Sequence, residues 1–354
     1  MKIKLSVLRG LVLGLSTLPL LAVSANAECI VGNVDERLEN FCILNEISGN
    51  LVDESTLGYF EDRLEKTATF LPYKSIPELP KTYHSFRLTP LFQYSDNLNG
   101  GNPDKELVVG DLVFVGDERY LAKEGLLVGG SLGVQGRYVY EKGRYLDYNL
   151  SHMYAQNPEF GFEVNTTTLN ICQSSLWKDW TYLDVCASTQ NVRKDLGSST
   201  EASLSLAASR LFQIKTGIFG KATLGANRNF NDYFAQDFLV ASFETTGASD
   251  VSGKVALSIG EEIPGELAKG YAASTTLTTQ LNEKPLTLSL DYSYSRGGKF
   301  LGLDRNDVNF YTSISYPIYR GIYLSVGYNF TDSTIDYFDT ASPTIGVQLA
   351  PLEF

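Results

Sequence analysis

The chain has 354 residues, of which 43% are hydrophobic, 12% aromatic and 20% charged. This composition is too apolar and too aromatic for a disordered chain, and the length allows one large domain or two small ones. The net charge of −12 and the presence of only two histidines exclude a nucleic-acid-binding role and any site built on several imidazoles.

Residues 1–27 have the pattern of a secretory signal peptide. Three basic residues precede the apolar stretch 11–23, and Ala25-Asn26-Ala27 forms a small-residue cleavage site. An uncleaved anchor is the alternative, but the apolar stretch is too short to span a bilayer comfortably. Glu28 separates the cleavage site from Cys29, so a lipid anchor is not expected. We expect the mature chain to begin at Glu28 in an oxidising compartment.

The four cysteines can pair in three ways. Their spacing favours two local disulfides, Cys29 with Cys42 and Cys172 with Cys186. Zinc ligation typically uses closer spacing, such as C-x2-C, which the sequence does not contain. The cysteines are therefore predicted to be structural, and no metal or other cofactor is expected.

Residues 28–84 differ from the rest of the chain, since they are acidic and lack a strict alternation. They contain one amphipathic patch, in which Leu57, Phe60 and Leu64 follow Ser55, a residue type that caps helices. Three prolines between residues 72 and 80 then predict an extended linker. The segment can be a periplasmic extension closed by a disulfide, a plug inside the domain that follows, or a poorly ordered leader.

From residue 85 onward, stretches of about ten residues alternate apolar and polar side chains between turn-forming clusters. In the clearest stretch, 285–295, Leu and Tyr at even positions oppose Thr, Ser and Asp at odd positions, and two later stretches repeat the pattern. No segment after residue 27 approaches the ~20 apolar residues of a spanning helix. The candidate strands are 86–95, 105–115, 124–140, 144–155, 160–173, 181–192, 199–212, 217–229, 233–246, 251–261, 271–281, 285–295, 307–317, 321–331 and 343–354.

A soluble β-sandwich also alternates, so three further features decide the fold class. The apolar faces often end in Tyr or Phe, as expected at a headgroup boundary, and the opposite faces are small and polar, as expected of a wet lumen. The C-terminal Phe354 resembles the signal by which bacterial outer-membrane barrels are assembled. Residues 85–354 are therefore predicted to form a transmembrane antiparallel β-barrel in the outer membrane of a Gram-negative bacterium.

Fifteen candidate strands is an odd number, whereas single-chain bacterial barrels have an even number of strands. Longer connections are usually extracellular, and counting back from Phe354 places 116–123, 193–198, 262–270, 296–306 and 332–342 outside. The shorter connections 141–143, 174–180, 213–216, 282–284 and 318–320 then lie in the periplasm. This parity leaves 86–95 outside the wall, or pairs it with an unrecognised strand. We predict about fourteen strands, with twelve and sixteen as alternatives.

The pair Cys172 and Cys186 is predicted to join two neighbouring strands. Asp179 lies midway between them, and a hairpin that turns there places the cysteines opposite each other, with Cβ atoms close enough for a disulfide. The apolar residues at 183, 185 and 187 then face lipid. Cys186 consequently faces the interior together with Asp184.

No enzyme is predicted, because neither histidine has a catalytic setting. His84 begins a candidate strand next to Ser85, whose side chain points to the opposite face, and His152 falls on a lipid-facing register. Trp177 and Trp180 are predicted to be membrane-interface anchors. The acidic residues between 104 and 118 are interpreted as a charged loop surface.

The stretch 86–101, an aromatic alternating strand that ends in Asn97-Leu98-Asn99-Gly100-Gly101, resembles the start of the barrel domain in surface lipoprotein assembly modifiers and related secretion barrels. The resemblance implies a barrel that assists the translocation or surface assembly of a protein. Those proteins usually carry tetratricopeptide helices before the barrel, and residues 28–84 are too short for such an array.

Two main functions follow. The first is translocation or surface assembly, with a secreted or surface-exposed client protein as partner. The alternative is a porin-like diffusion channel, whose Ser-, Thr-, Asp- and Asn-lined interior predicts a mild preference for cationic or neutral solutes. A structural or adhesive surface barrel is a third possibility. The other predicted partners are outer-membrane lipid, lipopolysaccharide and the barrel assembly machinery; nucleic acid is not among them.

Overall fold

The computed structural model describes residues 35–49, 64–66, 79–109, 111–247, 251–319, 321–350 and 352–353. The predicted signal peptide, Cys29, most of the predicted helical patch that follows Ser55, and the C-terminal Phe354 lie outside the described residues. Among the described helices, none is long and apolar enough to cross a membrane.

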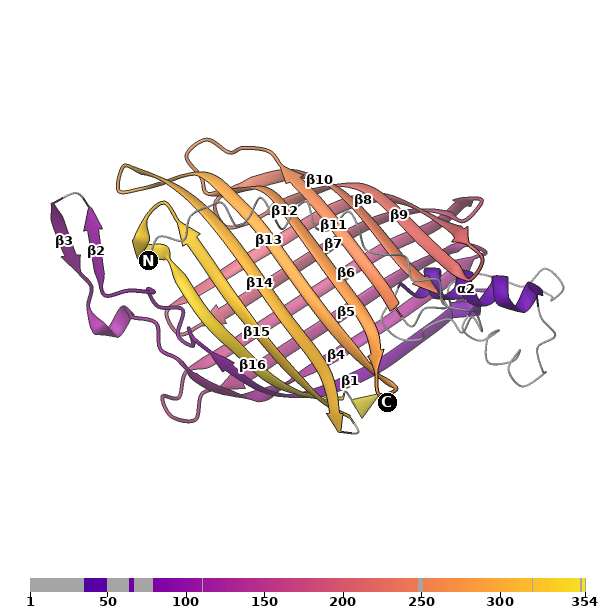
Figure 1. Cartoon of the computed structure of the whole chain (residues 1–354), viewed down its shortest axis with the longest axis horizontal. Helices are drawn as coiled ribbons and strands as arrows, with labels where there is room; N and C mark the ends of the chain where they lie inside the picture. The colour runs from indigo at the N-terminus through magenta and orange to yellow at the C-terminus, as the bar shows by residue number, and fades with distance from the viewer. Residues whose placement is uncertain are drawn as a thin grey trace.

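The dominant feature is one closed antiparallel sheet (Figure 1). Its strands are β1 (Lys81–Ser95), β4 (Gly125–Glu141), β5 (Arg144–Gln156), β6 (Glu163–Lys178), β7 (Thr181–Lys194), β8 (Gly197–Lys215), β9 (Ile218–Phe230), β10 (Ala235–Gly247), β11 (Val251–Gly260), β12 (Ala268–Leu281), β13 (Lys284–Phe300), β14 (Leu303–Tyr319), β15 (Ile322–Ser333) and β16 (Thr340–Leu349). Sequential strands pair, and β1 closes the barrel by pairing with β16. The short β17 (Leu352–Glu353) follows β16 and also pairs with β1. The predicted fourteen-stranded barrel is confirmed.

The predicted membership of the wall was wrong at two of the fifteen candidates. Residues 105–115 are not one strand but a separate hairpin of β2 (Glu106–Val109) and β3 (Leu112–Val115), because the chain turns at Asp111. Strands of four residues are too short to cross a bilayer, which needs about 9–11 residues. The candidate 86–95, which parity had left outside the wall, is part of β1 and pairs with β4 along its whole length.

The two faces of the wall differ as the alternation predicted. Large apolar side chains such as Leu224 (69% exposed) and Leu239 (68% exposed) point away from the barrel. Polar residues such as Ser274, Asp291 and Asn309, from three neighbouring strands, line an interior cavity instead. A wall that is apolar outside and polar inside suits lipid on one face and water on the other.

The two ends of the barrel also differ (Figure 1). At one end the connections are tight turns, such as 142–143, 179–180 and 282–283, whereas at the other they include the long connection 96–124 with the β2–β3 hairpin. Asp179, Trp180 and two residues of a second tight turn have positive φ, which two-residue hairpin turns require. Since extracellular loops are generally the longer ones, the tight turns mark the periplasmic end.

The Asn97–Gly101 stretch anchors this long connection. The Asn97 side chain accepts a hydrogen bond from the Gly101 amide and donates one to the Gly101 carbonyl, both at 2.9 Å. Asn99, which is 1% exposed, donates to the Leu121 carbonyl at 2.8 Å and accepts from the Lys123 amide at 3.0 Å. In this structure, the motif on which the sequence resemblance rests therefore holds the long connection in place through side-chain hydrogen bonds.

The helix α2 (Glu36–Gly49) lies at the periplasmic end of the barrel (Figure 1). Asp35 caps it by accepting hydrogen bonds from the amides of Arg37 (3.0 Å) and Leu38 (3.3 Å). Leu38, Phe41 and Cys42 have the i, i+3, i+4 spacing of one helix face, and all three are buried. This helix was not expected from the sequence, although its cap and its apolar spacing are both visible there.

Candidate functional site

The interior of the barrel is the candidate site, and α2 forms its periplasmic boundary. The apolar face of the helix packs against the ends of four wall strands. The Phe41 ring makes edge contacts with Trp180 (centroids 4.9 Å apart) and Phe219 (5.7 Å). Tyr182 and Leu211 complete this buried cluster. Trp180 was predicted to be a membrane-interface anchor, and this was wrong because its ring covers Phe41; Trp177 is 74% exposed, as an anchor would be.

The polar face of α2 is held by a buried arginine. The Arg37 guanidinium donates two hydrogen bonds to Asp184 (2.9 and 2.7 Å) and one each to Ser174 (2.7 Å) and the Tyr145 hydroxyl (2.6 Å). Its Cζ atom also lies 4.4 Å from the centre of the Tyr182 ring. Burial lowers the pKa of Arg37, but the hydrogen bond and charge of Asp184 outweigh it and raise the pKa above its usual value.

A second arginine joins the helix to the wall from the opposite direction. Arg137 of β4 binds Asp147 of β5 through Nε (2.5 Å) and Nη2 (2.9 Å). Its Nη1 donates to Glu36 of α2 and to the Lys66 carbonyl, both at 2.9 Å. The Arg137 guanidinium also lies 4.4 Å from the Tyr145 ring centre, so both arginines contact the same tyrosine.

The first residues of the helix make a third set of polar contacts. The Asp35 carboxylate accepts a hydrogen bond from Lys221 of β9 at 2.5 Å, and the Asp35 amide donates to Glu244 of β10 at 2.6 Å. Burial raises the pKa of Asp35, but the charge and hydrogen bond of Lys221, together with Arg37, hold the pKa below its usual value. The helix is thus fastened to wall strands from β4 to β10.

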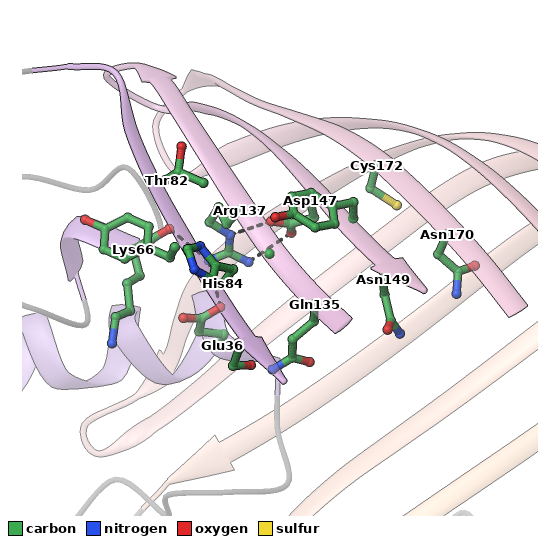
Figure 2. A pocket seen from close by; sticks show the side chains of 14 residues that line it. Glu36, Lys66, Thr82, His84, Gln135, Arg137, Asp147, Asn149, Asn170 and Cys172 are labelled. Carbon is green, nitrogen blue, oxygen red and sulfur yellow. Dashed lines mark hydrogen bonds and ion pairs between the residues drawn. The ribbon is translucent and has the colours of Figure 1, made fainter. Parts of the chain in front are cut away.

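The described residues line several interior cavities between α2 and the opposite mouth, among them four with volumes of about 780, 500, 490 and 330 Å³. The largest lies beside α2 and is lined by Glu36, Gln135, Arg137, Asp147 and Asn170, among others (Figure 2). The smallest lies beside Asp35 and Glu244. The other two are farther from the helix and share lining residues.

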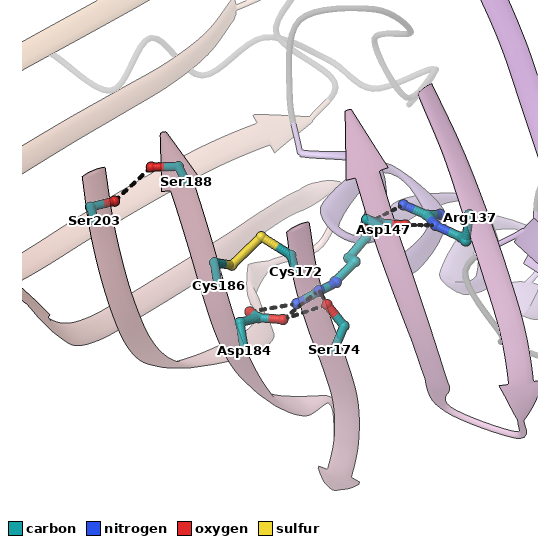
Figure 3. Close-up of a disulfide and its surroundings, with 9 residues drawn as sticks. Arg137, Asp147, Cys172, Ser174, Asp184, Cys186, Ser188 and Ser203 are labelled. Carbon is teal, nitrogen blue, oxygen red and sulfur yellow. Dashed lines mark hydrogen bonds and ion pairs between the residues drawn. A yellow bond between two sulfur atoms is a disulfide. The ribbon is translucent and has the colours of Figure 1, made fainter. Parts of the chain in front are cut away.

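The predicted disulfide between Cys172 and Cys186 is present. The two residues are directly opposed on β6 and β7, with Cα atoms 4.1 Å apart, and the connecting turn is at Asp179 and Trp180. Figure 3 shows the disulfide beside Asp184, which faces the interior as predicted. Cys42 is also disulfide-bonded, whereas Cys29, its predicted partner, lies outside the described residues.

Of the remaining residues singled out in the sequence, His84 is among the residues that line the cavity beside α2, whereas the others lie away from the contacts of that helix. His152 lies on the lipid-facing register with Leu150 and Tyr154, and its Nδ1 atom is 2.9 Å from the Thr167 hydroxyl oxygen. His84 is exposed and contacts the outward-facing Phe86 ring. The acidic loop residues are paired in part, since Asp117 binds Arg119 and Glu118 binds Lys105. The hydrogen bonds from Arg119 lower the pKa of Asp117 to about 2.

Sequence comparison assigns this chain to no group, since no family model and no curated protein matches it. It resembles solved structures of OccK2 (OpdF) from Pseudomonas aeruginosa in complex with glucuronate (8% identity, 77% of this chain and 98% of that chain covered, TM-score 0.43) and OprB from Pseudomonas putida (8%, 85% and 97%, 0.45). The outer membrane protein OpdK of Pseudomonas aeruginosa is similar at 7% identity (77% and 99% covered, TM-score 0.39). This likeness is too distant to carry an argument about function, and the comparisons do not support the resemblance to surface lipoprotein assembly modifiers.

The wall itself has the properties that a membrane requires. A closed sheet leaves no unpaired edge in the hydrocarbon, and its outward side chains are apolar. Barrels of this type span outer membranes. The chain is therefore an outer-membrane β-barrel protein, as the sequence predicted.

Proposed function

We propose that this protein is a diffusion channel for small polar solutes and that α2 narrows its periplasmic mouth. The observation that carries the proposal is the series of polar cavities inside a closed barrel. Side chains fill the interior of an eight-stranded barrel, whereas 16–18 strands leave an aqueous channel. Fourteen strands are closer to the second case, and the cavities supply space for water and a small solute.

The preference for cationic or neutral solutes remains part of this proposal. It is supported by the net charge of −12 and by interior carboxylates such as Glu201 and Asp291. Translocation or surface assembly of a client protein, the first hypothesis from the sequence, is not carried forward. No contact of the described residues favours it, and neither do the comparisons.

The test is single-channel conductance of the refolded protein in planar bilayers, with and without α2. The deletion should cover residues 28–78, because β1 begins at Lys81 and a longer deletion would open the wall. We expect stepwise conductance in the full chain, larger steps after the deletion, and a reversal potential on the cation-selective side in a salt gradient. A barrel that migrates faster unheated than boiled on a gel, yet conducts in neither form, would overturn the proposal.

A further inference from the structure

The part of the lumen that α2 does not reach contains a chamber that extends from the middle of the barrel to its extracellular end. Its two cavities, of about 500 and 490 Å³, share Asn229, Phe238 and Lys269 in their walls, so we treat them as one central chamber. Its polar lining is rich in amide side chains, which can donate and accept hydrogen bonds. These are Asn170, Gln190, Asn227, Asn229, Asn231, Gln236 and Asn309.

Among the described residues, three charged side chains line the central chamber, and they are Glu201, Lys269 and Asp291. In the described part of the chain, none of the three makes an ion pair or a side-chain hydrogen bond. The mouth is different, because Arg37, Arg137 and their carboxylates are paired there. The chamber thus presents charges of both signs that are free to meet a solute.

Lys269 and Asp291 lie at different heights of the same cavity. Lys269 of β12 is opposite Ser295 of β13, whereas Asp291 is four residues farther along β13 and opposite Ser274. Four residues of a strand cover about 13 Å. Both residues line the 490 Å³ cavity, so its positive and negative groups start from points that are well separated along the barrel wall.

We propose that the central chamber binds short zwitterionic solutes, of the class of dipeptides, with the carboxylate at Lys269 and the ammonium group at Asp291; this inference rests on the proposed channel function. A solute with one charge is attracted by one end and repelled by the other, and a neutral solute gains nothing from either. An extended dipeptide spans at most about 7 Å, which leaves room for both side chains to reach it. The amide side chains can then bind its peptide group.

The first measurement is calorimetric binding of glycylglycine to the refolded protein in detergent, with three comparison solutes. N-acetylglycine has only the carboxylate, glycinamide only the ammonium group, and glycerol neither. We expect glycylglycine to bind about tenfold more tightly than any of the three. One additional charge pair between the solute and the wall should raise the binding affinity about tenfold. Equal affinity for all four solutes would overturn the proposal.

Variants locate the site. Lys269→Met and Asp291→Asn should each weaken glycylglycine binding about tenfold, and Lys269→Arg should restore it. Two controls remove one charge of each sign away from the chamber: Lys254→Met in the cavity beside Asp35, and Glu141→Gln at the β4–β5 turn, whose pair with Arg144 is half exposed. If the controls weaken binding as much as the two test variants, the overall charge of the barrel determines binding and the proposed site is overturned.

Conductance separates the failure of this inference from failure of the proposed function. Glycylglycine should reduce the single-channel current of the wild type and leave that of Lys269→Met nearly unchanged. Conductance with no selective binding would overturn the zwitterion site and leave the channel. Selective binding by a barrel that never conducts would support the site and overturn the channel.

Discussion

The periplasmic mouth and the central chamber are lined by several of the same strands, yet the inward charged side chains are paired at the mouth and unpaired in the chamber. β7 supplies Asp184 at the mouth and Ser188 in the chamber, and β10 supplies Glu244 and Gln236 in the same order. At the mouth the inward charges are paired with α2, whereas in the chamber they face open space. The same alternating wall is therefore narrowed where α2 pairs with its inward charges and stays open where α2 is absent.

Arg37→Met is the strongest way to break this difference. It would remove the hydrogen bonds to Asp184, Ser174 and Tyr145 and leave the partly buried Asp184 carboxylate without its charge partner, at a cost to α2 docking of up to about 3 kcal/mol. We expect larger conductance steps and protease cleavage within α2. Arg144→Met is the matched control, because its pair with Glu141 is half exposed and worth at most about 1 kcal/mol. Equal effects of both variants would contradict the docking role of Arg37.

Phe41→Ala tests the apolar half of the same contact. Phe41 is 8% exposed and packs on Trp180 and Phe219, and such a truncation typically costs about 3 kcal/mol or more. Since Phe41 is on the helix and not in the wall, the unheated protein should still migrate as a folded barrel while conductance rises. Trp177→Ala, at a side chain that is 74% exposed, should leave conductance unchanged. Loss of the folded band in Phe41→Ala would mean that α2 is needed for the barrel itself.

Removal of the Cys172–Cys186 disulfide should have a smaller effect on the mouth. The bond closes a loop with a sequence separation of 14, for which the entropic stabilisation is at most about 3 kcal/mol, and the β6–β7 ladder already holds the two strands. Replacing both cysteines by alanine should lower the denaturant midpoint but preserve barrel closure. An unchanged midpoint in this double variant would contradict a stabilising role of the disulfide.

Acid should release the helix more gently. Because the pKa of Asp35 is lowered when α2 is docked, its contribution is complete above the ordinary value of about 3.9 and is lost as pH falls through the lowered pKa. Conductance should therefore rise as the pH falls below the ordinary aspartate pKa of about 3.9. It should stay constant between about pH 5 and pH 8, because Asp35 is ionised throughout that range. Lys221→Met should shift the rise to higher pH, since it removes the main charge that lowers the pKa. A rise on the alkaline side would contradict this assignment.

The parts of the fold that depend on local periodicity were visible in the sequence. The alternation along 285–295 predicted which face of β13 is polar, because side chains in a strand point to opposite faces whatever its neighbours are. The same rule, with a turn near Asp179, predicted the Cys172–Cys186 pair. The amphipathic start of α2, from Asp35 to Cys42, was also present in the sequence but was not recognised.

Other features depend on residues far apart in the chain, and only the tertiary structure decided them. Arg37 meets Asp184 across 147 positions, and Lys221 meets Asp35 across 186. The closure of the barrel also depends on strands that are far apart in the chain. For this reason the sequence placed 105–115 in the wall and left 86–95, part of β1, outside it. The sequence by itself determined a membrane barrel, because a repeat of two residues separates lipid from water. The structure decided where the charges are paired, because that depends on which segments the closed wall brings together.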